Sequence, residues 1–174
     1  MSNLRLINET EITSSVSSVN VTDVFSADFD IYKITISNPN ADTDSDVSLR
    51  LINSSGSVVS DSNYNFARLG MPAWTTFQEN RGTNSNRGQY VDGFGRSTEA
   101  ENGGNVIWVF NPFSSSSYTF LLNQSNKKSP NGTIGNKSIY VLKQTASMTG
   151  INFFQDTGNI TGMDIRTYGL RVDS

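Results

Sequence analysis

The sequence predicts an all-β fold: an antiparallel, jelly-roll-like β-sandwich of about 8–10 strands with long loops. Short runs that alternate apolar and polar residues recur along the 174-residue chain and are bounded by turn residues, whereas helical periodicity is hard to find. Charged residues make up only 17% of the chain, so Ser, Thr and Asn supply most of its polarity. Those residues suit exposed sheet faces and tight turns better than helix surfaces.

The first half of the chain shows this alternation most clearly after a short leading segment. We expect residues 1–15 to form an N-terminal arm, with Leu4–Ile7 inside it, and residues 16–174 to form a single β-sandwich domain. In the second expected strand Tyr32, Ile34 and Ile36 share one face, which predicts that this face is buried. The strands expected in this half are Val16–Phe25, Asp30–Asn38, Val47–Asn53, Val58–Val59 and Asn63–Phe66.

The second half contains two segments that we expect to be loops. Gly70–Gly104 is rich in Gly and poor in aliphatic residues, so it predicts long irregular loops with one or two embedded strands. Gln124–Ser138 is polar and contains the turn signal Asn131-Gly132, so it predicts a polar loop. The strands expected around them are Asn105–Asn111 and Ser117–Asn123, which form one hairpin, then Ile139–Thr145, Ile151–Asp156 and Met163–Val172.

Composition argues against several classes of function. The chain has no cysteine and no histidine, which excludes thiolate metal sites, cysteine nucleophiles and a Ser-His-Asp triad. Its net charge of −3 and the scatter of its basic residues argue against a nucleic-acid partner. No apolar run approaches the ~20 residues of a membrane span, and the first residues lack a hydrophobic signal core. We therefore expect a soluble, non-enzymatic protein without a cofactor.

Acidic residues offer two weak chemical motifs. Asp42, Asp44 and Asp46 alternate as at the start of a calcium loop, but the glycine and glutamate that an EF-hand requires further along are missing. A solvated acidic turn is the favoured interpretation over a Ca²⁺ site. The second motif is a glycosidase carboxylate pair drawn from the loop-rich segment. No local spacing supports such a pair, and ordinary surface charge is favoured for Glu79, Glu99 and Glu101.

Aromatic residues in the Gly-rich segment are the candidate contact residues. Rings set among Asn, Gln, Arg and Gly are the mixture that carbohydrate-binding and protein-binding loops use. The competing interpretation is that the rings cap the open end of the sandwich or pack between subunits. The candidates for ligand or subunit contact are Trp74, Phe77, Tyr90 and Phe94.

Three stretches carry a resemblance to a known family. "SSVSSVNVTDVFSADFDIYKITISN", "NVIWVFNPFSSSSYTF" and "GINFFQDTGNITGMDIRTYGL" resemble, in this order, small β-sandwich domains in virion proteins of tailed phages, especially phages of marine bacteria and cyanobacteria. The resemblance spans roughly Val16 to Leu170 and departs most at Gly70–Gly104. It implies a jelly roll, often a homotrimer, on the virion surface, and it transfers no active-site residue.

Two functions follow as hypotheses from this resemblance. The first is a capsid decoration or cement protein that contacts other virion proteins such as the major capsid protein. The alternative is a receptor-binding or adhesin module of a head or tail fibre, in which the aromatic loops recognise host surface glycan. A glycan hydrolase or lyase is a third class, which the acidic residues support least.

Overall fold

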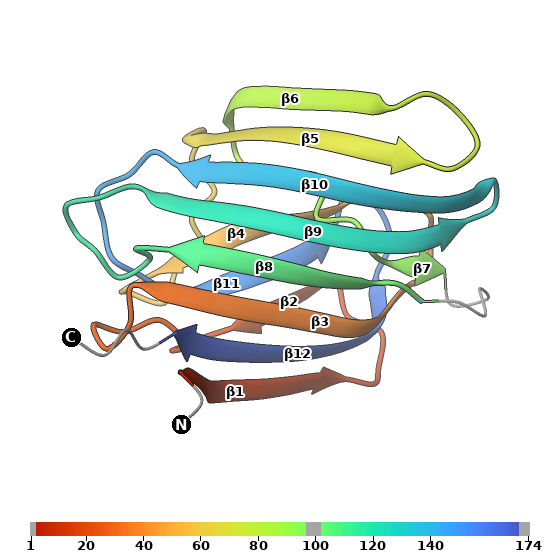
Figure 1. Cartoon of the computed structure of the whole chain (residues 1–174). Coiled ribbons are helices and arrows are strands. Elements are labelled where there is room, and N and C mark those ends of the chain that lie inside the picture. Colours follow the sequence, from red (N-terminus) through yellow and green to blue (C-terminus); the bar gives the residue numbers. More distant parts are fainter. Residues whose placement is uncertain (1–2, 97–101, 171–174) are drawn as a thin grey trace.

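The computed structural model describes residues 3–96 and 102–170, which form two β-sheets packed face to face (Figure 1). Within these residues the large sheet has eight antiparallel strands, in the order β1-β12-β3-β8-β9-β10-β5-β6, and the small sheet has the order β2-β11-β4. A two-residue strand, β7 (Gly95–Arg96), pairs in parallel with β3. The predicted all-β sandwich is confirmed, with more strands than expected.

The strands of the large sheet are long, and those of the small sheet are shorter. The large sheet contains β1 (Leu4–Ile12), β12 (Ile160–Leu170), β3 (Ile31–Ala41), β8 (Gly104–Phe110), β9 (Thr119–Ser129), β10 (Gly132–Leu142), β5 (Tyr64–Pro72) and β6 (Gln78–Ser85). The small sheet contains β2 (Ser18–Val21), β11 (Met148–Gln155) and β4 (Val47–Asn53).

The leading segment is part of the sandwich. Residues 1–15 are predicted as an arm, but residues 4–12 form β1, which pairs antiparallel with β12 from Leu4↔Leu170 to Ile12↔Met163. Ile7 and Ile12 also pack against the hydrophobic core. β1 passes through a register shift between Leu6 and Asn8, beyond which Glu9 and Glu11 face solvent and Thr10 and Ile12 face inward, as expected of an edge strand with one side exposed.

The prediction of a loop is wrong for Gln124–Ser138, which is a hairpin of two strands, whereas the described part of Gly70–Gly104 has strands embedded in irregular loops, as predicted. Gln124–Ser138 forms the ends of β9 and β10, which pair up to Ser129↔Gly132 around a turn at Pro130 and Asn131. Gly70–Gly104 contains the end of β5, all of β6, β7 and the start of β8. Sequence periodicity misses these strands because they extend to exposed parts of the large sheet, where neutral polar residues replace apolar ones.

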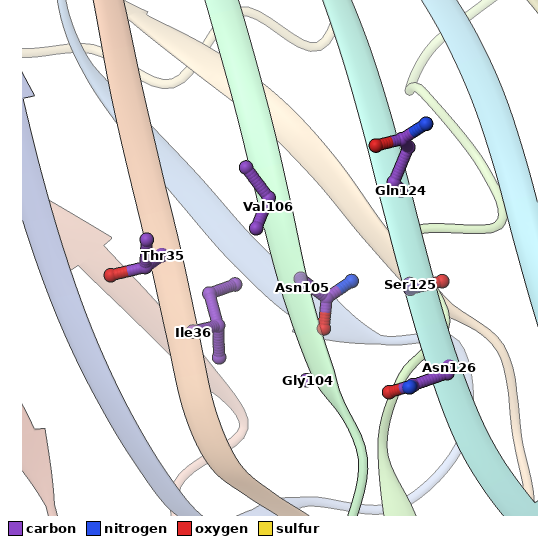
Figure 2. A pocket seen from close by; sticks show the side chains of 8 residues that line it. All are labelled: Thr35, Ile36, Gly104, Asn105, Val106, Gln124, Ser125 and Asn126. Carbon is purple, nitrogen blue, oxygen red and sulfur yellow. The ribbon is translucent and has the colours of Figure 1, made fainter.

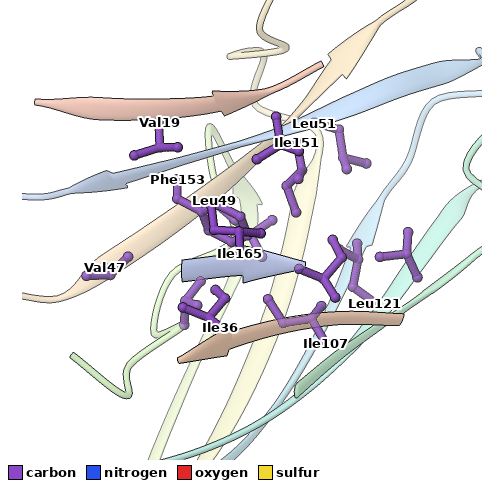
Figure 3. Close-up of a cluster of buried hydrophobic side chains, with 14 of the residues drawn as sticks. Val19, Ile36, Val47, Leu49, Leu51, Ile107, Leu121, Ile151, Phe153 and Ile165 are labelled. Atoms are coloured by element: carbon purple, nitrogen blue, oxygen red, sulfur yellow. The ribbon is translucent and has the colours of Figure 1, made fainter. Parts of the chain in front are cut away.

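The core lies between the two sheets, and the faces predicted to be buried are buried. Tyr32, Ile34 and Ile36 have exposed fractions of 0–2%. Figure 3 shows aliphatic and aromatic side chains of both sheets pointing toward one another. Fully burying each such side chain contributes about 1.5–3 kcal/mol. Those labelled are Val19, Ile36, Val47, Leu49, Leu51, Ile107, Leu121, Ile151, Phe153 and Ile165.

Candidate functional site

The outer face of the large sheet, turned away from the small sheet, carries two adjacent rows of apolar and aromatic side chains. Strand register places one residue from each of seven strands, β1 to β5 in sheet order, in each row, because side chains two positions apart lie on the same face. The first row contains Leu6, Tyr168, Lys33, Trp108, Leu122, Ile139 and Ala67. The second row contains Leu4, Leu170, Ile31, Phe110, Phe120, Val141 and Asn65. We call these two rows the apolar band.

Several members of the apolar band are substantially exposed in the single chain. The exposed fractions are 50% for Leu6, 48% for Phe120 and 55% for Ile139. An apolar groove of about 580 Å³ runs over this part of the face, with Phe110, Phe120 and Ile139 among its lining residues. A contiguous exposed apolar surface that crosses most strands of a sheet is typical of an interaction site. The apolar band is therefore the candidate functional site.

Charged residues border the apolar band along one side. The next row out contains Glu9 and Arg166, whose side chains form an ion pair at 2.6 Å between Oε1 and Nη2. On the opposite part of the sheet, Glu79 and Lys137 line a second hollow of about 620 Å³, together with Arg81 next to the first row. Charges of both signs thus lie along one side of the apolar band, as in part of the polar rim of a protein interface.

The four aromatic candidates do not converge on one site. Trp74 and Phe77 lie in the turn between β5 and β6 and are 39% and 66% exposed. Trp74 packs over the β9–β10 turn, since a Cβ atom added to Gly132 would lie 2.9 Å from its ring. Tyr90 is half-buried, and Phe94, at 4% exposure, belongs to the hydrophobic core. Only Trp74 and Phe77 are thus free to contact a ligand.

The segment that follows β6, residues 86–94, crosses the inner face of the large sheet and is held there by side chains. Asn105 Nδ2 donates to the carbonyls of Val91 and Asp92 at 2.8 and 3.0 Å, and Asn123 Nδ2 donates to Val91 at 2.7 Å. Because buried carbonyls need donors, these amides determine the path of the segment.

Tyr90 is fixed in a left-handed backbone conformation, with φ of +66°. Its carbonyl accepts hydrogen bonds from Ser138 Oγ at 3.0 Å and from the hydroxyl of Tyr140 at 2.9 Å. Its ring packs edge-on to Phe66 and lies under the guanidinium of Arg68, 5.1 Å from the ring centroid. These contacts stabilise a backbone conformation that non-glycine residues rarely adopt. They indicate that the Tyr90 side chain serves to pack the segment against the sheet.

A charged cluster lies beside this segment at one end of the sandwich. Arg68 Nε and Asp92 Oδ2 form an ion pair at 3.1 Å, with exposed fractions of 9% and 4%. Arg87 Nη2 contacts Asp156 Oδ2 at 2.8 Å. Burial raises the pKa of the Asp46 carboxyl above its ordinary value, and the neighbouring Asp92 and Asp156 carboxylates add to that rise. Buried pairing of this kind fixes the packing of the loop rather than supplying an exposed reactive group.

The acidic residues considered for metal binding or hydrolysis have separate partners. Asp42 Oδ1 accepts from the backbone N–H of Asn159 at 2.8 Å, and Asp44 contacts Lys127 Nζ at 3.4 Å. In the described part of the chain, no group of three or more acidic, histidine or cysteine side chains is arranged to hold a metal ion. Glu79 lies on the outer face of β6, while Glu99 and Glu101 lie outside the described residues.

A further hollow lies where β8 begins. It has a volume of about 450 Å³ and opens between β3, β8 and β9 (Figure 2). Its lining residues include Gln124 and Asn126, whose side chains carry amide groups, and Gly104 at the start of β8. The hollow is open, and none of its lining residues is charged.

Comparisons with known proteins give no family. No family model matches the chain, and no curated protein is similar to it. Among solved structures, a variant fructofuranosidase from Schwanniomyces occidentalis complexed with fructosylnystose matches with a TM-score of 0.31 and 6% identity over 95% of this chain. The match spans 34% of that enzyme, and at this TM-score it carries no argument about function. Among the described residues, no helix is long and apolar enough to cross a membrane.

Sequence reasoning missed the apolar band, although its signal is present. In "NVIWVFN", Ile107 and Val109 alternate with Val106, Trp108 and Phe110, so both faces of this strand are apolar. A strand that is apolar on both faces is typical of a sheet covered on both sides. Only one of those sides is covered by the small sheet in the described part of the chain, and the other is the outer face that carries the apolar band.

Proposed function

We propose that this protein is a non-enzymatic structural module of a tailed-phage virion, most consistent with a capsid decoration or cement protein. The observation that carries the structural role is the apolar band, because a wide apolar face on a sandwich domain marks a surface that is buried in an assembly. A module of this kind acts by contact and needs no reactive constellation.

The assignment to a phage particle is supported by the resemblance of three stretches and by where they lie. Their strands, β12, β3, β8 and β9, are consecutive in the large sheet, and β2 and β11 are neighbours in the small sheet. The resemblance therefore follows a contiguous part of the sandwich. Two of these strands, β8 and β9, contribute Trp108, Phe110 and Phe120 to the apolar band.

Electron microscopy of particles from the phage that encodes this chain tests the proposal. Antibody–gold labelling is expected to mark the particle surface at many regularly spaced positions on the head. Particles from which the gene is deleted should lose that labelling. Absence of the protein from purified particles would overturn the assignment, and labelling confined to a fibre tip would favour the alternative function.

The alternative is a receptor-binding module that recognises host surface glycan, and one observation favours it. Phe77 and Trp74 are exposed at the tip of the β5–β6 hairpin, where aromatic rings are free to stack on sugars. A glycan array with the purified protein tests this function. Specific binding that Trp74→Ala abolishes, while Tyr118→Ala leaves it unchanged, would favour adhesion over decoration; Tyr118 is also an exposed aromatic residue, 42% exposed.

A further inference from the structure

We infer that the apolar band packs face to face against the apolar band of a second copy of this chain, related by a two-fold axis. The inference rests on the proposal that this face is an assembly surface. It does not depend on the assignment to a phage particle, so the two can fail separately.

The first argument is that the apolar band is complementary to itself. A two-fold contact buries the same patch on both subunits, so each part of the patch must suit the part opposite. Consider a two-fold axis that lies in the plane of the contact, perpendicular to the strands and midway between the two rows. This axis places the first row of one copy over the second row of the other. Trp108 then lies over Phe110, Leu122 over Phe120, and Ile139 over Val141. On β8, β9 and β10 apolar residues thus face apolar residues, while on β3 Lys33 lies over Ile31.

The second argument concerns charge. The ion pair of Glu9 and Arg166 and the side chains of Glu79 and Lys137 lie in the row beyond the apolar band, so this contact leaves them at its rim. Lys33 is the charged residue inside the apolar band, and its ammonium lies 5.8 Å from the centroid of the Trp108 ring. A cation held against an aromatic face needs less water than a free one. A nucleic acid or another strongly charged partner would find no matching surface here.

The third argument is size. The apolar band takes in seven strands of the large sheet, from β1 to β5 in sheet order, and these span six spacings, or about 29 Å at ~4.8 Å each. A contact about five residues long along each strand covers ~17 Å, or roughly 490 Å² per copy in flat projection. Two copies would then bury about 1,000 Å² in total, which is the area that a specific interface has to reach.

Sedimentation velocity of the purified chain tests the pairing. At micromolar concentration we expect the mass of a dimer. Phe120→Asp and, separately, Ile139→Asp should each give a monomer, because either change places a carboxylate inside the contact. Both residues are about half exposed, so the variants should keep the far-ultraviolet circular dichroism of the unchanged protein. Phe77→Asp is the matched control: it removes a more exposed aromatic residue outside the apolar band and should remain a dimer.

Distance measurements between spin labels determine which faces meet. The chain has no cysteine, so Gln124→Cys places a single label on the outer face, and Ser18→Cys places one on the opposite face of the sandwich. In a face-to-face dimer the Gln124 labels lie close together, and the Ser18 labels are farther apart by at least about 20 Å, since two sandwiches separate them. A monomeric or trimeric chain would overturn the inference, as would a dimer in which the Ser18 labels are the closer pair. None of these results would bear on whether the protein lies on a virion.

Discussion

At the scale of single residues, buried amides decide where the segment 86–94 lies. Asn105 supplies donors to two carbonyls of this segment from the inner face of β8 and is almost fully buried. Its amide therefore supplies hydrogen bonds to the backbone that a neighbouring strand supplies elsewhere in the fold. The sequence does not reveal this role, because Asn105 is one of many asparagines in the chain and simply precedes an apolar run.

We predict that Asn105→Ala lowers the free energy of unfolding by about 2–3 kcal/mol, because it removes the side-chain donor of the Asp92 carbonyl and one of the two donors of the Val91 carbonyl. Urea unfolding followed by circular dichroism measures the change. Asn126→Ala, an exposed asparagine on the outer face of β9, is the control and should alter stability by less than about 0.5 kcal/mol. Equal effects of the two substitutions would show that the amide of Asn105 does not hold the segment.

Asp46 gives the charged cluster a dependence on pH. Burial is the main cause that raises the pKa of its carboxyl above 3.8, so the folded protein binds this proton more readily than the unfolded chain does. Ionised Asp46 therefore lowers the free energy of unfolding at pH values above its raised pKa, and this loss disappears as the pH falls below 3.8.

We predict that Asp46→Asn is more stable than the unchanged protein at pH 7, and that the difference narrows as the pH falls toward 3.8 and vanishes below it. Chemical unfolding across this pH range measures the difference. Asp30→Asn removes an exposed carboxylate elsewhere and is the control. A variant that is less stable than the parent at pH 7 would mean that the charged Asp46 is stabilised by Arg68 and Lys127 more than burial penalises it.

At the scale of elements, close approach of backbones in the small sheet depends on a glycine in β11. A Cβ atom added to Gly150 would overlap the carbonyl oxygen of Val21 in β2. Gly135 in β10 has no such constraint, because its added Cβ atom would lie 3.5 Å from Met71 Cε, an ordinary contact. The two glycines lie inside strands and differ mainly in what faces them.

We predict that Gly150→Ala destabilises the protein by about 1–3 kcal/mol, since β2 must shift away from β11. Gly135→Ala should be neutral within about 0.5 kcal/mol or slightly stabilising, because it also restricts the unfolded chain. Thermal unfolding of the two variants side by side gives the comparison. Similar losses of stability in both variants would indicate that replacing any glycine inside a strand carries this cost. The close approach of β2 to β11 would then not be its cause.

The same scale shows which elements sequence reasoning recovers. Strands with one buried face, such as Ile31–Ala41 and Ile160–Leu170, follow from alternation because burial selects an apolar residue at every second position. Gln78–Ser85 contains no apolar residue, since β6 is an exposed edge strand, and its pairing with β5 comes from backbone hydrogen bonds that any sequence without proline can make. The candidate site was missed for a related reason: its rows join residues from distant strands, which only the register brings together.

At the scale of the whole molecule, the two sheets share one core. Phe153 of β11, in the small sheet, is fully buried in the cluster that also contains Ile107 and Ile165 of the large sheet. The chain passes between the sheets at β1–β2–β3–β4–β5 and again at β10–β11–β12. Because the first and last strands, β1 and β12, are also paired with each other, neither sheet can form completely without contributions from both ends of the chain.

We predict that Phe153→Ala lowers the free energy of unfolding by about 3–5 kcal/mol and does so for both sheets at once. The two tryptophans, Trp74 and Trp108, lie in the large sheet and its β5–β6 hairpin, so their fluorescence reports on a part of the molecule that excludes the substituted strand. Circular dichroism reports on all strands. Both transitions should move together to lower denaturant, since a shared core makes unfolding cooperative. A dichroism transition that shifts while the fluorescence transition keeps its midpoint would show that the large sheet is stable without the small one. The apolar band would then be the surface of an independently folding unit.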